Sequence, residues 1–164
     1  IDSYLDNYDY KDYSDYSLSR QENFTTDIVK RTYFNEDVKD KAYVAYNYIL
    51  GDSNEFSKIE NIDIIDDILL GSSNTEFRKY FIDNNICEDV YSYVQKDRKE
   101  TVYSIIFKYV SDDKLESLDA EYKSLLKGII NKGFDYEQVQ ASINKKNFSI
   151  KEEINKTSSP KGVS

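Results

Sequence analysis

The stretch from residue 59 to residue 93 constrains the fold most, because its apolar pattern changes twice within a short distance. Apolar residues first recur at three- and four-residue spacing, which places them on one face of a helix. This predicted stripe consists of Ile59, Ile62, Ile65, Ile68 and Leu69. Gly71 ends the helix, and Ser72, Ser73 and Asn74 supply capping oxygens for a second helix from about Thr75. The buried side of that second helix is predicted to be Phe77, Tyr80 and Phe81, and the turn NNICED then leads into a strand.

Strand composition occurs on both sides of this helical pair. Ile28–Phe34 and Lys41–Leu50 precede it, while Asp89–Gln95 and Thr101–Val110 follow it as a hairpin closed at Lys96–Lys99. In the last strand one face is predicted to carry Tyr103, Ile105, Phe107 and Tyr109, and the other Val102, Ile106 and Val110. A strand that is apolar on both faces is typical of the middle of a sheet.

Two helices are predicted after the hairpin. The first is capped by Ser111–Asp113, runs to about Lys132, and ends at Gly133. Its apolar stripe is predicted to contain Leu115, Leu118, Tyr122, Leu125, Leu126, Ile129 and Ile130. Asp135 is placed to begin the second helix as its N-cap. The predicted order β-β-α-α-β-β-α-α indicates an α+β fold, with a mostly antiparallel sheet and helices packed on one face.

The charge balance bears on partners. The 164 residues carry a formal charge of −9 and a pI of about 4.6, which argues against nucleic acid as a partner. An acidic surface favours cationic partners such as basic peptides, although the charge is equally explained as a means of keeping the protein in solution. No apolar run approaches the roughly 20 residues that cross a bilayer, so no membrane partner is predicted. The abundance of Asn, Lys, Ile and Tyr suggests an AT-rich genome, for which an apicomplexan parasite would fit.

Several polar residues are candidates for chemical sites. The chain has no histidine and one cysteine, Cys87, which is predicted to be a buried small side chain. Asp63, Asp66 and Asp67 could in principle bind Ca²⁺ or Mg²⁺, but a solvated helix face explains them better. Ser72 and Ser73 lack a base and are interpreted as capping residues, and Glu152 and Glu153 as exposed carboxylates. We therefore assign no catalytic, cofactor-binding or metal-binding residue to this chain.

Three stretches resemble a known family of enzymes. They are LLGSS with the following turn NNICEDVYSY, YVAYNYILGD, and the run GFDYEQVQASINKKNFSIKEE. Together they are similar to the pitrilysin/insulinase class of zinc metallopeptidases, in its presequence-protease and falcilysin-like branch. The similarity is to the second, non-catalytic domain of the N-terminal lobe. The glycines of the family's turn are not kept at Asn85–Asp89.

This resemblance implies a domain division and a function. Residues 1–24 would be a helix or tether from a preceding domain, 25–155 the non-catalytic domain, and 156–164 a linker leading out. The parent would be a zinc metalloendopeptidase of short unstructured peptides, in which this domain walls the substrate chamber and contacts the other domains. Zinc would be bound by the parent and not by this chain, and the resemblance suggests a mitochondrion, plastid or food vacuole as location. The alternative is a stand-alone acidic interaction domain without enzymatic activity.

Overall fold

The computed structural model describes residues 12, 19, 22, 24–26 and 42–158, and the chain divides into two compact units, residues 1–30 and 31–164. The described residues of the first unit are exposed to solvent, and its chain bends at Thr25 and Thr26. Most of the helix or tether expected at residues 1–24, and all of the strand expected at Ile28–Phe34, lie outside the described residues. The division at residues 24 and 155 stays a prediction.

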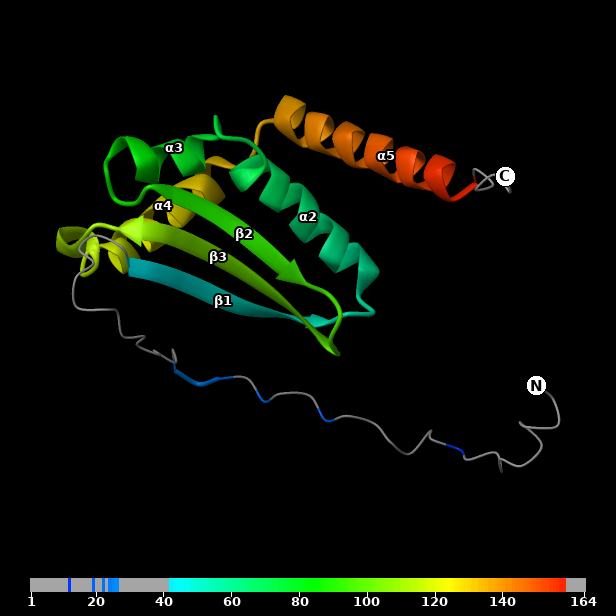
Figure 1. Ribbon diagram of the computed structural model, residues 1–164, viewed down its shortest axis with the longest axis horizontal. Helices are drawn as coiled ribbons and strands as arrows, with labels where there is room; N and C mark the ends of the chain where they lie inside the picture. Colours follow the sequence, from blue (N-terminus) through cyan, green and yellow to red (C-terminus); the bar gives the residue numbers. More distant parts are fainter. Residues whose placement is uncertain (1–11, 13–18, 20–21, 23, 27–41, 159–164) are drawn as a thin grey trace, which may run out of the picture. The chain divides into compact units, whose positions relative to one another are not determined.

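The second unit has the predicted α+β architecture (Figure 1). Its elements are β1 (Ala42–Asp52), α2 (Phe56–Leu70), α3 (Glu76–Asp83), β2 (Asp89–Gln95), β3 (Glu100–Val110), a short 3-10 turn (Asp112–Lys114), α4 (Leu118–Lys132) and α5 (Tyr136–Ser158). After the first expected strand, this order is the one that the sequence predicts. The chain enters an α-helix later than expected after Ser111, because a 3-10 turn precedes α4. Helix α5 also continues three residues into the predicted linker, as far as Ser158.

Within residues 42–158 the sheet has three strands in the order β1-β3-β2, and both pairs are antiparallel. β3 therefore lies in the middle, as its two apolar faces predict. β1 and β2 run parallel to one another on either side of it, because α2 and α3 carry the chain across to the far edge.

The end of β3 corrects one predicted face. Tyr109 has a positive φ of 57°, and the register of β1 against β3 shifts between Ala42 and Tyr43. This irregularity turns Tyr109 to the outer face, where its ring lies 5.3 Å from that of Tyr43. Val110 instead points inward and is fully buried. The alternation predicted from sequence, with Tyr109 beside Phe107 and Val110 on the opposite face, is therefore wrong at these two positions.

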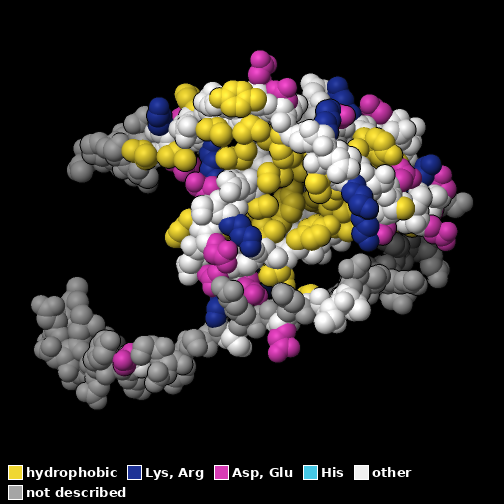
Figure 2. Space-filling model, turned by 180° about the vertical axis from the view of Figure 1, so that it is seen from behind, with side chains coloured by type: hydrophobic (Ala, Val, Ile, Leu, Met, Phe, Trp, Pro, Cys, Tyr) yellow, Lys and Arg dark blue, Asp and Glu magenta, His cyan; other side chains and the backbone are white. Residues whose placement is uncertain are grey.

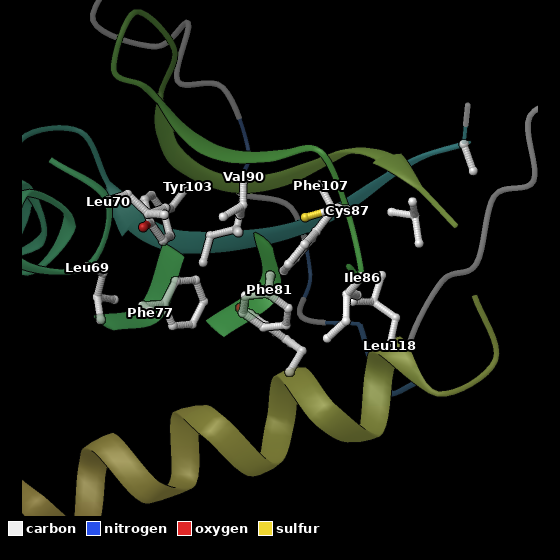
Figure 3. Packing of buried hydrophobic residues seen from close by; sticks show 14 residues of the cluster. Leu69, Leu70, Phe77, Phe81, Ile86, Cys87, Val90, Tyr103, Phe107 and Leu118 are labelled. Carbon is white, nitrogen blue, oxygen red and sulfur yellow. The ribbon is translucent and has the colours of Figure 1, made fainter. Parts of the chain in front are cut away.

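The core lies between the sheet and its helices (Figure 3). Phe81 is fully buried, and its ring centroid lies 4.7 Å from that of Phe107 on β3 and 5.2 Å from that of Phe77. From α4, Tyr122 stacks on Tyr46 of β1 at 4.3 Å. The other buried members of this cluster are Ala42, Leu69, Leu70, Ile86, Cys87, Val90, Tyr103, Ile105, Val110 and Leu118.

Three residues predicted to be buried are exposed. Tyr80 on α3 is 36% exposed, Leu115 before α4 is 39% exposed, and Ile130 near the end of α4 is 76% exposed. For Tyr80 and Ile130 the helical spacing is right, but the packed part of the helix is narrower than its apolar stripe. Leu115 instead lies in the turn before α4, outside the helix predicted to include it. For α4 the buried contacts concentrate at Leu118 and Tyr122, in its first turns.

The helix ends follow the predicted capping chemistry in part. The Asp135 carboxylate accepts a 2.7 Å hydrogen bond from the Glu137 N–H, as predicted. The N-cap of α3 is Thr75 and not the predicted Ser72–Asn74, and its hydroxyl accepts a hydrogen bond from the Arg78 backbone N–H. Gly133 ends α4 with a φ of 71°, a conformation that favours glycine. At Gly71 a side chain would collide with the Asp67 carbonyl and carboxylate, although the backbone there is helical.

Candidate functional site

One face of the sheet carries an exposed row of aromatic and apolar side chains. Figure 1 looks onto this face, with α4 passing behind the strands, and no helix within residues 42–158 packs on it. The exposed fraction is 49% for Tyr43, 40% for Ile49, 39% for Tyr91 and 57% for Tyr93. We refer to these four residues, with their cross-strand neighbours Val102 and Ile106, as the open sheet face.

The two middle rows of the open sheet face contain small and large side chains. Ala45 pairs there with Ile106, and Asn47 pairs with Ser104. The Ser104 hydroxyl donates a 2.7 Å hydrogen bond to the Asn47 side-chain oxygen, which satisfies both groups within the sheet. Tyr91 and Tyr93 stand beside these rows on β2. An exposed surface rich in aromatic and apolar side chains is suited to packing against another protein element.

The helix side of the molecule contains a cavity of about 1240 Å³. Figure 2, seen from behind relative to Figure 1, shows hydrophobic side chains gathered in a hollowed area. The cavity is bounded by the end of α2, by α3, by α4 and by the first turns of α5. Ile68, Leu125 and Ile129 supply apolar lining, and Lys79 and Asp135 are among its charged residues. Such a mixture accommodates an amphipathic group without dictating one ligand chemistry.

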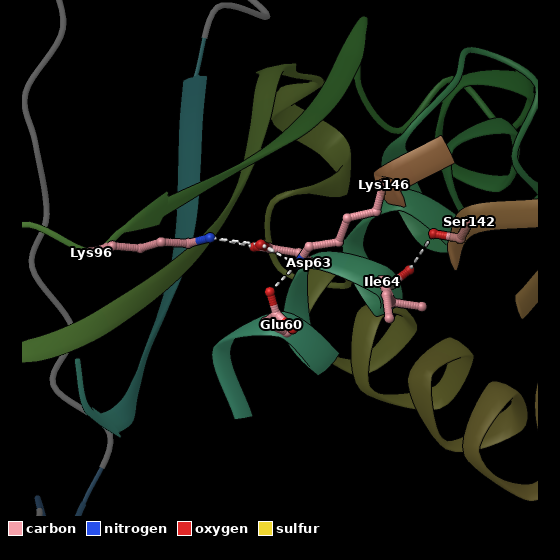
Figure 4. Close-up of polar contacts among 6 residues, drawn as sticks. All are labelled: Glu60, Asp63, Ile64, Lys96, Ser142 and Lys146. Carbon is pink, nitrogen blue, oxygen red and sulfur yellow. Dashed lines mark hydrogen bonds and ion pairs between the residues drawn. The ribbon is translucent and has the colours of Figure 1, made fainter. Parts of the chain in front are cut away.

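The three aspartates of α2 do not form a solvated face, which corrects the expectation from sequence. Each carboxylate contacts a side chain of another element of the fold (Figure 4 shows Asp63). Asp63 accepts hydrogen bonds from Lys96 at the end of the hairpin (2.7 Å) and from Lys146 of α5 (3.0 Å). Asp66 accepts one of 2.7 Å from the Tyr103 hydroxyl, and Asp67 is paired with Lys145.

These contacts set the protonation of the groups involved. Burial alone would raise the pKa of Asp63, but the hydrogen bonds from Lys96 and Lys146 outweigh it and hold that pKa below its ordinary value. Burial, reinforced by the hydrogen bond to Asp66, raises the pKa of Tyr103. Asp63 is therefore held as an anion that joins α2 to two neighbouring elements.

The remaining candidate residues from the sequence are accounted for as follows. The Ser72 hydroxyl accepts a hydrogen bond from the Asn74 N–H, so it shapes the turn, and the cap itself is Thr75. Cys87 is buried and unpaired with another cysteine, and burial raises the pKa of its thiol to about 11. Glu152 and Glu153 are exposed on α5. The residues predicted from sequence did not include Lys96, Lys145 or Lys146. A signal for the pairing of α5 with α2 is nevertheless present, because two adjacent lysines lie on one predicted helix and acidic residues recur at three- and four-residue spacing on the other.

The described part of the chain contains neither a metal-binding cluster nor a membrane-spanning helix. There, no group of three or more cysteine, histidine or acidic residues lies close enough to hold a metal ion. The whole sequence has no histidine and a single cysteine, so it does not fit the nitrogen and sulfur ligand sets of zinc. Among the described helices, none combines the length and apolarity needed to span a bilayer.

Comparison with known proteins finds similarity to short parts of much longer chains. No protein-family model matches the sequence. The chain is 25% identical over 158 residues to protein HypA of Clostridium perfringens, an alignment that covers 92% of this chain and 16% of HypA. It is 26% identical over 130 residues to presequence protease 1, chloroplastic/mitochondrial, of Arabidopsis thaliana, covering 78% of this chain and 12% of that protein. The chain thus spans less than a fifth of either relative and has a weak, partial similarity to a peptidase.

Proposed function

We propose that this chain is a catalytically silent domain of a longer zinc metalloendopeptidase of the presequence-protease kind. The observation that carries the proposal is the 130-residue similarity to a presequence protease, which accompanies the three family-like sequence stretches. The open sheet face supports it as well, because Tyr43, Tyr91 and Tyr93 form the kind of surface that a neighbouring domain covers. Zinc would be held by a different segment of the parent protein, since this chain lacks a fitting ligand set.

In this role the domain would form one side of the substrate chamber and would make that side negatively charged. Its helices and sheet would support one side of a chamber that encloses short unstructured peptides, and its net charge of −9 would attract basic ones. The proposal also covers the parent protein, to which it assigns the catalytic residues, the peptide preference and an organellar location. The apicomplexan source suggested by composition stays a prediction, and the relatives found come from a bacterium and a plant.

The test uses the complete gene product that contains these 164 residues. We expect a protein several times longer than this chain that contains one zinc ion per molecule and cleaves an unstructured basic peptide in a chelator-sensitive manner. Replacing Tyr91 and Tyr93 with serine should weaken cleavage by disturbing the packing of the open sheet face. Tyr136→Ser is the matched control, because Tyr136 is 78% exposed on α5, away from the sheet.

Two outcomes would contradict the proposal. One is a complete protein of only about 164 residues, which would leave the stand-alone acidic interaction domain as the explanation. The other is a long protein that contains no zinc and cleaves no peptide. No observation on the described residues specifically favours the stand-alone alternative.

A further inference from the structure

The contacts of α5 differ in kind from those of the other helices. Along its described length only Ser142 is buried, while Val139, Gln140, Ile143 and Lys146 are half-buried. The large apolar side chains in its second half are exposed, with Phe148 at 64% and Ile154 at 58%. Apolar burial therefore contributes little to holding α5 in place.

Polar contacts with α2 supply most of the attachment (Figure 4). Lys146 lies 3.0 Å from Asp63 and 3.6 Å from Glu60, and Lys145 is paired with Asp67. The Ser142 hydroxyl donates a 3.4 Å hydrogen bond to the carbonyl of Ile64. We call this set, from Ser142 to Lys146 on α5 and from Glu60 to Asp67 on α2, the α2–α5 latch.

The connection between α4 and α5 can act as a hinge. Residues 131–138 are all exposed, so no buried side chain anchors this segment. Gly133 has a φ of 71° and open space where a side chain would be, and glycine adopts more backbone conformations than any other residue. Asp135 then begins α5 with its own cap, which keeps the helix intact independently of α4.

We propose that α5 is a hinged arm, held closed by the charges of the α2–α5 latch, which swings about Gly133 and opens the cavity beside it. Asp135, Gln138, Ala141, Ser142 and Lys145 line the α5 side of the cavity of about 1240 Å³. Movement of α5 away from α2 removes this wall and exposes the apolar lining on α2 and α4. The proposal depends only on contacts within residues 56–158 and holds independently of the peptidase assignment.

The charge pairs are of the strength that a switch requires. The lysine side chains are 64% exposed at Lys145 and 25% exposed at Lys146. Pairs with this much access to water each change an equilibrium by a factor of about two to five, and salt screens them. Asp63 is faced by Lys146 from α5, by Lys96 from the hairpin and by Glu60 from its own helix, so loss of Lys146 leaves its charge neutralised by Lys96. The arm can therefore open without leaving a buried, unpaired carboxylate.

Distances between spin labels on the full 164-residue chain test the proposal. Labels are placed at Ser57→Cys on α2 and Lys151→Cys on α5, in a Cys87→Ala background whose unfolding curve is checked first. A second pair, Ser57→Cys with Asp97→Cys on the hairpin, monitors the body of the domain. Between about 0.05 and 1 M salt we expect a longer α2–α5 distance to become populated, while the α2–hairpin distance stays constant. Distances that do not respond to salt, or that change together in both pairs, would overturn the proposal.

Charge reversal separates the latch from general destabilisation. Lys145→Asp should increase the open population at low salt, and adding Asp67→Lys should return it towards the original value by restoring the pair in reverse. Lys123→Asp is the matched control, because it makes the same charge change on α4, where Lys123 pairs with Asp119 of its own helix. If the double variant stays as open as Lys145→Asp, or if the control opens the arm equally, the latch is not what holds α5.

Discussion

Helices α3 and α4 are attached to the sheet in a different way from that in which α5 is attached to α2. Phe77 and Phe81 of α3 and Tyr122 of α4 are buried to 2% exposure or less against the strands. On the described part of α5, by contrast, the only buried side chain is a serine, and two lysines pair with carboxylates of α2. Apolar burial is strong and shared among many neighbours, whereas exposed ion pairs are weak and respond to salt. The first region should therefore unfold as a unit, and α5 should detach locally.

The largest effect that this comparison predicts comes from truncating a core ring. Phe81→Ala should lower the free energy of unfolding by about 3–5 kcal/mol, because Phe81 is fully buried between α3 and β3 and its loss leaves a cavity. Phe148→Ala removes the same ring from α5 and should cost less than about 0.5 kcal/mol. Chemical denaturation of both variants measures the two values. Equal losses would mean that α5 belongs to the cooperative core.

The reactivity of thiols gives a second contrast, measured in the native state. Cys87 is 5% exposed, and burial raises its pKa to about 11. It should react with a thiol reagent near pH 8 at least about 1000-fold more slowly than a cysteine introduced at the exposed Ser149, because only global unfolding uncovers it. Comparable rates for the two thiols would show that the core opens as readily as α5.

The sign of the Cys87 shift also fixes a pH dependence. The folded state binds the thiol proton more tightly than the unfolded state, so the contribution is fully present below the ordinary thiol pKa of 9.0 and is lost as the pH rises towards 11. Denaturation between pH 8 and 11 should show falling stability, with a shallower decline in Cys87→Ala. The buried Tyr103 and Tyr122, whose pKa values burial also raises, should account for the decline that remains.

The sequence predicts those features of the fold that depend on neighbours along the chain. The Ile59–Leu69 stripe, the cap at Asp135, and the hairpin around Lys96–Lys99 all arise within a few residues, and each forms as expected. The cap of α3 also arises locally, but it falls on Thr75 and not on the predicted Ser72–Asn74. Local spacing could not show that Tyr109 takes a positive φ. A positive φ is predicted from sequence at glycine and a few polar residues, and tyrosine is not one of them.

Features that depend on contacts between distant parts of the sequence were not predicted either, because local spacing does not contain them. The exposure of Ile130 depends on how far the other elements extend over α4, which its own spacing does not contain. Asp63 and Lys146 are 83 positions apart, so the pairing that turns a predicted solvated face into an attachment point follows only from the packing of α5 on α2. The candidate functional surfaces arise in the same way, since both the open sheet face and the cavity are made by segments distant in sequence.

The smallest expected effect tests the polar side of the comparison. Asp63→Asn keeps the size of the side chain but removes the charge that Lys96 and Lys146 contact. Because the Asp63 side chain is 27% exposed and both partners reach water, the variant should lose less than about 1 kcal/mol of unfolding free energy.

The pKa of Asp63 is lowered in the folded state, so its contribution is present above the ordinary value of 3.8 and disappears as the pH falls below it. Wild type and Asp63→Asn should therefore differ in stability at pH 7 and converge towards pH 3. Glu60→Gln is the matched control, because Glu60 lies 3.6 Å from Lys146 and is more exposed, so it should show a smaller difference. A loss of several kcal/mol in Asp63→Asn would place the α2–α5 latch within the cooperative core and remove the distinction between the two regions.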